Sequence, residues 1–217
     1  MKRIVIFAVI LGLVSGSAHA ANIWERAIQN FEKQDAKNPP AENGIVFVGS
    51  SSIRFWNTDD DFPDLRIINR GFGGSQTADS VEFAPRIVLK YKPRLVALYA
   101  GDNDIATGKS PAEVVANTEK FFALVHDALP DTRILYVAIK PSILRWSMVG
   151  DMREVNRQVK AITEKDARLD FIDIDTPMMG DDGKPRKELF IKDGLHLSRA
   201  GYDLWNAVIQ PYLTTEK

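Results

Sequence analysis

The stretch GIVFVGSSSIRFW, residues 44–56, joins an apolar run to a glycine and three consecutive serines. The run from Ile45 to Val48 is apolar at every position, which predicts a β-strand buried on both faces. The serines that follow allow two interpretations: they shape a turn, with one hydroxyl capping the next helix, or one of them is a nucleophile. The composition of the run does not decide between the two.

The rest of the chain alternates between strand-like and helix-like segments. Further strands are predicted at residues 66–69, 95–99, 133–139 and 169–174. Amphipathic helical patterns cover residues 23–31, 111–129, 148–167 and 199–212, and the first of them is terminated by Pro39 and Pro40. Another helix begins near Thr77, and we expect Pro85 to interrupt it. This alternation predicts a parallel sheet between layers of helices, with ligands beyond the carboxyl ends of the strands.

Residues 1–20 have the three-part pattern of a bacterial secretory signal peptide. Two basic residues precede an apolar run, and Ala18-His19-Ala20 provides the small residues of a cleavage site. The apolar run, residues 4–14, is too short to span a bilayer comfortably, and no second run of spanning length follows. We therefore expect an exported protein, periplasmic or secreted, that begins at Ala21 and has no stable membrane insertion after cleavage.

Charge and residue inventory exclude several classes of function. The formal net charge is −1 and becomes −3 without the two basic residues of the signal peptide. No basic cluster stands out, so nucleic acid is not an expected partner. The chain has no cysteine, which rules out thiol nucleophiles and thiolate metal sites. Only His126 and His196 follow the signal peptide, so we expect no metal centre. His126 lies late in a predicted helix and is interpreted as structural.

Polar segments follow the second and third predicted strands and precede the last helix. GFGGSQ, residues 71–76, lacks the third glycine of a dinucleotide fingerprint and the Gly-Lys-Ser/Thr ending of a P-loop. It either binds an anion through backbone N–H groups or makes a tight turn. GDND, residues 101–104, does not fit a calcium loop. Its Asn103 is a turn former or an amide donor. Asp193 precedes His196 by three residues, just before the last helix.

Together these segments resemble the SGNH hydrolases, the GDSL-type lipase and acylhydrolase superfamily, and above all its platelet-activating-factor acetylhydrolase catalytic-subunit-like branch. The resemblance covers about residues 44–212. Its four blocks fall on Gly49-Ser50-Ser51, on INRGFGGSQT with Gly74, on Gly101-Asp102-Asn103-Asp104 and on Asp193-Gly194-Leu195-His196. One block departs from the family pattern, because Ser50 replaces the usual Asp and Ser52 replaces the usual Leu or Ile.

The resemblance implies a fold and a set of roles. The fold would be a flavodoxin-like, three-layer α/β/α sandwich with a five-stranded parallel sheet. Residues 44–217 would form the hydrolase domain, after an N-terminal helix and linker at residues 21–43. Ser51 would be the nucleophile, with His196 as its base and Asp193 orienting the imidazole. The backbone N–H groups of Ser51 and Gly74 and the side chain of Asn103 would form the oxyanion hole.

The expected function is that of an exported serine esterase. It would hydrolyse short-chain acyl or acetyl esters of small molecules or carbohydrates through an acyl-enzyme, without metal or cofactor. A sugar O-deacetylase, a lysophospholipase and a thioesterase remain open. The alternative class is a non-catalytic carbohydrate- or lipid-binding module on the same fold. Trp56, Trp146 and Arg145 are candidates for lining the substrate site, although core packing explains a tryptophan equally well. No substrate-binding residue or oligomeric state is assigned.

Overall fold

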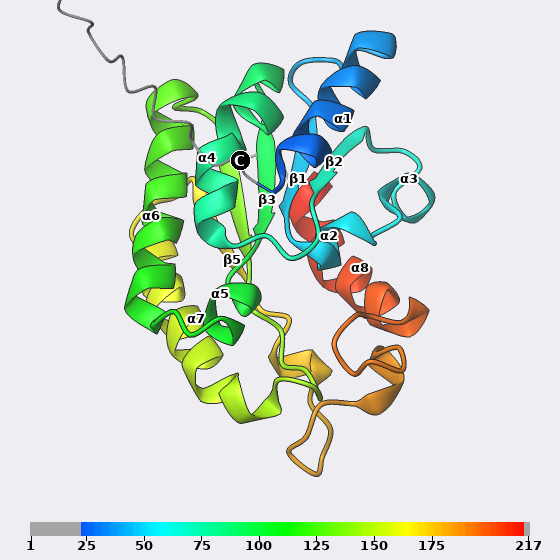
Figure 1. Ribbon diagram of the computed structural model, residues 1–217, viewed down its shortest axis with the longest axis vertical. Helices are drawn as coiled ribbons and strands as arrows, with labels where there is room; N and C mark the ends of the chain where they lie inside the picture. The colour runs from blue at the N-terminus through cyan, green and yellow to red at the C-terminus, as the bar shows by residue number, and fades with distance from the viewer. Residues whose placement is uncertain (1–22, 215–217) are drawn as a thin grey trace, which may run out of the picture.

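The computed structural model describes residues 23–214, in which strands and helices alternate along the chain (Figure 1). The strands are β1 (Ile45–Gly49), β2 (Ile67–Gly71), β3 (Leu95–Tyr99), β4 (Arg133–Val137) and β5 (Leu169–Ile172). The helices are α1 (Glu25–Lys37), α2 (Ser51–Arg54), α3 (Thr58–Asp61), α4 (Thr77–Ile87), α5 (Asp102–Ala106), α6 (Pro111–Ala128), α7 (Val149–Thr163) and α8 (Arg199–Thr214). The predicted signal peptide, residues 1–20, lies outside the described residues.

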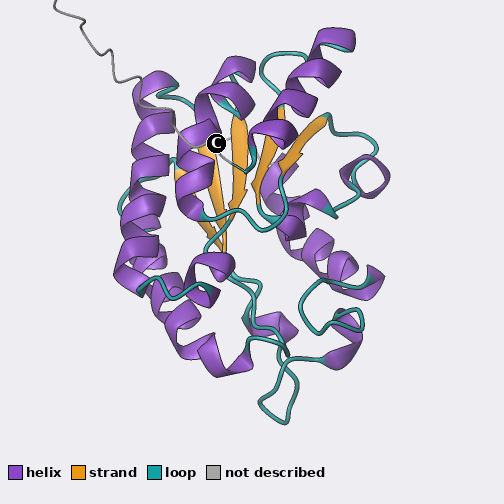
Figure 2. Ribbon diagram, viewed as in Figure 1, coloured by secondary structure: helices purple, strands orange, loops and turns teal. Residues whose placement is uncertain are grey.

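The five strands form one parallel sheet in the order β2-β1-β3-β4-β5. This is the flavodoxin-like order, in which the chain reverses direction across the sheet between β1 and β3 and ligands bind at that switch point. The arrowheads in Figure 2 all point toward the end of the molecule where α5 and the long loops gather. The fold predicted from the sequence is confirmed, and the segments after β1, β2 and β3 share one edge of the sheet.

Helices cover both faces of the sheet. On one face, Val46 and Val48 of β1 belong to a core cluster that includes residues of α1, α4, α6 and α7. On the other face, Ile45 and Phe47 pack in a second cluster with Trp205 and other residues of α8. Figure 1 shows α4, α6 and α7 on one side of the sheet and α8 in orange-red on the other. Because alternate residues of β1 are buried on opposite faces, the strand is apolar at every position.

Helix α4 continues through Pro85 instead of being interrupted there, so that expectation is wrong. The proline removes one backbone hydrogen bond, which typically costs about 3 kcal/mol in a helix interior. The buried side chains of Phe83, Ala84 and Ile87 lie on the same face and pack in the core with α6. Their burial offsets the missing bond, and the helix ends two residues after the proline.

The segment before β1 is packed on the domain. Ile28 of α1 is fully buried in the first core cluster, and Arg86 of α4 pairs with Glu25 and Glu32 of α1 at 2.7 Å each. Trp24, just before α1, donates its indole N–H to Asp79 of α4 at 3.1 Å. No helix within residues 23–214 is long and apolar enough to cross a membrane.

Candidate active site

Ser51 opens α2, directly after β1 ends at Gly49. Gly49 has a φ of +142°, and a Cβ there would lie 1.8 Å from the Tyr99 carbonyl oxygen of the neighbouring strand. Only glycine therefore allows the chain to leave the strand in this direction. Asn69 of β2 then restrains the turn, because its side-chain amide donates to the Ile53 carbonyl oxygen at 2.7 Å. These contacts hold Ser51 at the carboxyl edge of the sheet.

The three consecutive serines have different surroundings. Ser50 and Ser52 are 0% and 1% exposed, whereas Ser51 is half-buried. Ser50 occupies the N-cap position of α2, but its side chain accepts no capping hydrogen bond. The Ile53 N–H that such a cap would bind donates instead to the Ser50 carbonyl oxygen at 3.1 Å. Ser51 alone of the three has its hydroxyl beside a histidine.

The loop before α8 brings Asp193 and His196 to Ser51. Nε2 of His196 lies 3.0 Å from Oγ of Ser51, and Nδ1 of His196 lies 2.6 Å from Oδ2 of Asp193. The other oxygen of Asp193 accepts the backbone N–H groups of Leu195 and His196, each at 2.9 Å. The ring of Phe55 lies edge-on to the imidazole, with 5.2 Å between ring centroids. Residues 145 positions apart in the chain thus form one continuous row of polar contacts.

The charge on Asp193 determines the tautomer of His196. Burial opposes ionisation of Asp193, but the hydrogen bonds from the His196 ring and from the Leu195 and His196 N–H groups outweigh it and lower the pKa of Asp193 to about 2. An ionised carboxylate only accepts hydrogen bonds, so Nδ1 carries the proton. Nε2 then presents its lone pair to Ser51, whose hydroxyl donates to it. This arrangement can remove a proton from Ser51.

Gly74, in the loop after β2, and Asn103, in α5 after β3, lie at the same edge of the sheet. Gly74 has a φ of +83°, and a Cβ at this position would lie 3.0 Å from the ring of Trp24. Within residues 23–214, neither the Gly74 N–H nor the Ser51 N–H donates to another group of the protein. The Asn103 amide nitrogen donates to the Ser75 carbonyl oxygen at 2.9 Å, which leaves its second N–H for a ligand. Two backbone donors and one side-chain donor are thus available for an anion.

Asp104 of α5 connects this helix to the start of α4, which follows the Gly74 loop. Its two carboxylate oxygens accept the backbone N–H of Thr77, the first residue of α4, at 3.2 and 3.0 Å. The carboxylate is fully buried, and burial raises its pKa to about 6 although the hydrogen bond from Thr77 opposes the rise. The contact positions the Gly74 loop relative to Asn103.

A buried charged cluster lies beside the candidate site, and sequence reasoning missed it. Lys140 follows β4 and is 1% exposed, and its Nζ lies 3.3 Å from Oδ2 of Asp102. Nη1 of Arg145 lies 3.1 Å from the same oxygen. The sequence signal for this cluster was a lysine directly after the apolar run Ala138-Ile139 at a strand end. A lysine is rarely buried unless it is paired, so a lysine at this place indicates a buried partner.

Trp56 and His126, both singled out in the sequence, lie away from the site. Trp56 is 3% exposed in the second core cluster and donates its indole N–H to Asn206 at 2.8 Å, so it does not line a substrate site. His126 of α6 is within hydrogen-bond distance of the Thr132 carbonyl oxygen, and burial lowers its pKa, as suits a structural role. Trp146 packs against Lys184, whose Nζ lies 4.9 Å from the ring centroid.

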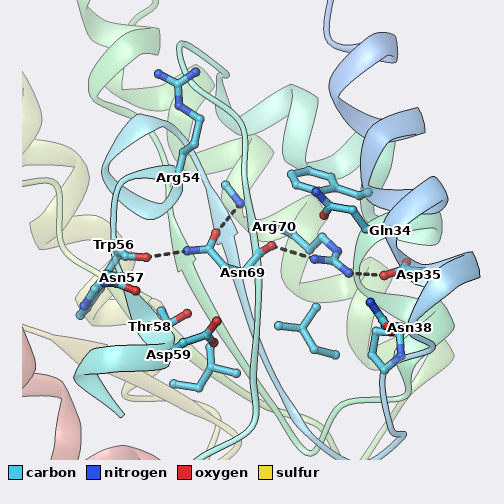
Figure 3. A pocket seen from close by; sticks show the side chains of 15 residues that line it. Gln34, Asp35, Asn38, Arg54, Trp56, Asn57, Thr58, Asp59, Asn69 and Arg70 are labelled. Carbon is cyan, nitrogen blue, oxygen red and sulfur yellow. Dashed lines mark hydrogen bonds and ion pairs between the residues drawn. The ribbon is translucent and has the colours of Figure 1, made fainter. Parts of the chain in front are cut away.

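A cavity of about 570 Å³ lies along the edge strand β2, between α1 and the segment that follows Ser51. Figure 3 shows the side chains that line it. Its lining includes Asn69, which donates to the Trp56 carbonyl oxygen at 3.0 Å, and Arg70, which pairs with Asp35. Ser51, Asp193 and His196 are not among the lining residues, so this cavity is separate from the candidate site. Residues 23–214 contain no group of three or more His, Asp or Glu placed to hold a metal ion.

The chain is similar to known proteins in sequence pattern and in fold. The model of the GDSL-like lipase/acylhydrolase family matches residues 56–204, a span that includes Gly74, Asn103, Asp193 and His196 and begins after Ser51. A search of curated proteins gives no significant match.

Several solved structures have the same fold. A Streptococcus pneumoniae protein named for platelet activating factor is 24% identical with a TM-score of 0.78, covering 87% of this chain and 92% of its own. A GDSL-like lipase from Bacteroides thetaiotaomicron is 20% identical with a TM-score of 0.76, covering 86% and 96%. An acetyl-xylooligosaccharide esterase variant from a Geobacillus species is 17% identical with a TM-score of 0.65, covering 82% and 97%.

Proposed function

The chain belongs to the GDSL-like lipase/acylhydrolase family and is a carboxylic ester hydrolase, and we propose that it acts through an acyl-enzyme formed on Ser51. The observation that carries the proposal is the contact between Nε2 of His196 and Oγ of Ser51 at 3.0 Å, with Asp193 on the other ring nitrogen. Serine is a weak nucleophile until a base removes its proton, and this contact supplies the base.

The reaction follows from the positions of these donors and acceptors. His196 takes the Ser51 proton as Oγ attacks the ester carbonyl, and Asp193 stabilises the imidazolium that forms. The oxyanion accepts the N–H groups of Ser51 and Gly74 and the free N–H of Asn103. Collapse transfers the His196 proton to the leaving alcohol and leaves an ester on Ser51. Water, deprotonated by His196, then attacks this ester and releases the acid.

Serine replacements test the nucleophile, with the neighbouring serines as matched controls. We expect Ser51→Ala to lower kcat on p-nitrophenyl acetate by on the order of 10⁴-fold or more. Ser50→Ala and Ser52→Ala remove hydroxyls that are buried and away from His196, so they should keep most of the activity. A dead Ser50→Ala enzyme beside an active Ser51→Ala enzyme would refute the assignment.

A non-catalytic carbohydrate- or lipid-binding module on the same fold is the alternative to this mechanism. It would bind esters without turnover, so wild-type protein that lacks any Ser51-dependent hydrolysis across a panel of esters would favour it. The ionised Asp193 and the half-buried Ser51 argue against it, because a binding module has no need to hold a histidine against a serine.

For the substrate we propose short-chain acyl esters, acetyl esters above all. The fold is shared with an acetyl-xylooligosaccharide esterase, which supports a sugar O-deacetylase. A lysophospholipase or thioesterase is the second candidate, and one observation favours it. Phe55, Ile143, Leu144 and Ile191 are 49%, 40%, 62% and 50% exposed, and they lie next to the loop that carries His196.

A panel of substrates separates these candidates. It comprises p-nitrophenyl esters of increasing chain length below their micellar concentration, an acetylated xylooligosaccharide and a lysophospholipid. The short-chain proposal predicts the highest kcat/KM on acetyl and butyryl esters. The short-chain proposal would be overturned if kcat/KM were higher on long-chain esters and Leu144→Ser lowered it. Leu144 is one of the four exposed apolar residues beside the His196 loop and takes no part in the reaction.

We also propose that the protein is exported to the periplasm or secreted, with residues 1–20 as its signal peptide. The support lies in the sequence: two basic residues, an apolar run and the Ala18-His19-Ala20 site.

A further inference from the structure

A cluster of three charged side chains adjoins Asn103. None of them takes part in the proposed ester-cleaving steps. Asp102 precedes Asn103 at the start of α5, and the loop after β4 contributes Lys140 and Arg145. Their side chains are 6%, 1% and 15% exposed, respectively. Lys140 also donates to the hydroxyl of the fully buried Tyr99 at 3.1 Å. Burying three charges is costly, so an arrangement of this kind calls for a role.

Arg145 connects this cluster to Asn103. One nitrogen of its guanidinium lies 3.1 Å from Asp102, and another donates to Oδ1 of Asn103 at 2.9 Å. The planar guanidinium holds its donors in a rigid fork, so the ion pair with Asp102 also determines the direction of the donor aimed at Asn103. Lys140 contacts the same carboxylate oxygen of Asp102 and restrains it.

The oxygen of the Asn103 amide faces a hydrogen-bond donor and its nitrogen faces an acceptor, so the amide has only one favourable orientation. Arg145 offers only donors and faces Oδ1, whereas the Ser75 carbonyl accepts and faces Nδ2 at 2.9 Å. A flipped amide would put N–H groups against a cation and an oxygen against a carbonyl oxygen. The correct orientation keeps the second N–H available. The positive charge on Oδ1 also polarises the amide and strengthens its N–H as a donor.

We propose that Arg145 is a positioning residue for ester hydrolysis, which locks the Asn103 amide so that its free N–H faces the oxyanion, while Asp102 and Lys140 hold Arg145 in place. The inference rests on the proposed role of Asn103. Arg145 acts through Asn103, not on the reacting atoms, so its contribution is confined to steps in which negative charge develops.

Replacement of Arg145 by Met keeps much of the side-chain length and removes the donors. We expect kcat to fall roughly 10- to 100-fold with KM nearly unchanged, a smaller effect than the loss of an oxyanion donor, at about 10²- to 10³-fold. Arg157→Met is the matched control, because Arg157 is an exposed residue of α7 paired with Glu154, and it should retain wild-type kcat.

A double-mutant cycle distinguishes positioning from a general structural role. In an Asn103→Ala background, Arg145→Met should cause no further loss of kcat, because the group it orients is gone. If Arg145→Met does not fold, Arg145→Lys preserves a cation beside Asp102 and runs through the same cycle. An unchanged kcat in the single variant, or a loss that persists in full without Asn103, would overturn the inference.

The same cycle tests the underlying proposal separately. If Asn103→Ala itself retains wild-type kcat, Asn103 is not an oxyanion donor and the proposed mechanism loses that residue. If Asn103→Ala loses activity and the Arg145 effect is simply additive, the mechanism stands and only the positioning role fails.

Discussion

Replacing Asp104 by Asn should remove a pH dependence of stability that lies between pH 3.8 and about 6. The Asp104 carboxylate is fully buried, and burial raises its pKa from 3.8 to about 6. The Thr77 N–H opposes the rise by hydrogen bonding to the charged form, the nearby carboxylate of Asp102 adds to it, and Lys109 lowers it. Ionisation of Asp104 therefore costs more free energy in the folded protein than in the unfolded chain.

The sign and size follow from linkage. The folded state binds the Asp104 proton more tightly than the unfolded state, so the free energy of unfolding decreases as pH rises from 3.8 to about 6 and is flat on either side. A rise of about two pKa units corresponds to about 3 kcal/mol. Asp104→Asn has no titration there and keeps an oxygen for the Thr77 N–H. Its unfolding free energy relative to wild type should therefore increase by about 2.5 kcal/mol between pH 4 and pH 7, because the unfolded carboxyl is already partly ionised at pH 4.

Urea unfolding followed by circular dichroism at pH 4, 5, 6 and 7 measures this difference. Groups that titrate identically in both proteins cancel. Glu154→Gln is the control: hydrogen bonds from Arg157 and Gln158 lower the pKa of Glu154 to about 2, so its difference from wild type should stay flat above pH 5. A constant or falling difference for Asp104→Asn over the same range would refute the reasoning.

Three further predictions concern the reaction and the mature protein. Asn103→Asp should fold with a normal melting temperature yet lose roughly 10²- to 10³-fold in kcat, because an anion replaces the oxyanion donor; retention of more than about a tenth of wild-type kcat, at normal melting, would remove Asn103 from the site. Asp193→Asn should lower kcat by up to about 10⁴-fold, because the amide no longer holds the His196 proton on Nδ1. A variant with wild-type kcat/KM across pH would show that another group orients the imidazole. Mass spectrometry of periplasmic or secreted protein should give a chain that begins at Ala21, and an intact Met1 would contradict the signal peptide.

The strands and most helices could be predicted from the sequence, because local periodicity reports burial. The strand at Leu95–Tyr99 has the predicted bounds, and the other strands are misplaced by no more than two residues at an end. The prediction errors occur where a contact with a distant part of the chain determines where an element ends. Strand β2 runs beyond Asn69 to Gly71 because Gly71 pairs with Gly49 of β1, and that pairing joins residues distant in the chain. Helix α4 survives Pro85 because its buried face packs on neighbouring elements.

The sequence by itself determined the order of the strands and helices and, through four motifs at strand ends, the candidates Ser51, Gly74, Asn103, Asp193 and His196. Each motif is local, so each could be recognised before its partner was located. Only the tertiary structure decided that His196 contacts Ser51 and neither neighbouring serine, and that Arg145 and Lys140 converge on Asp102 behind Asn103. Contacts between buried polar groups leave no periodic trace in the sequence, because they join strand ends far apart in the chain that meet only when the parallel sheet aligns them along one edge.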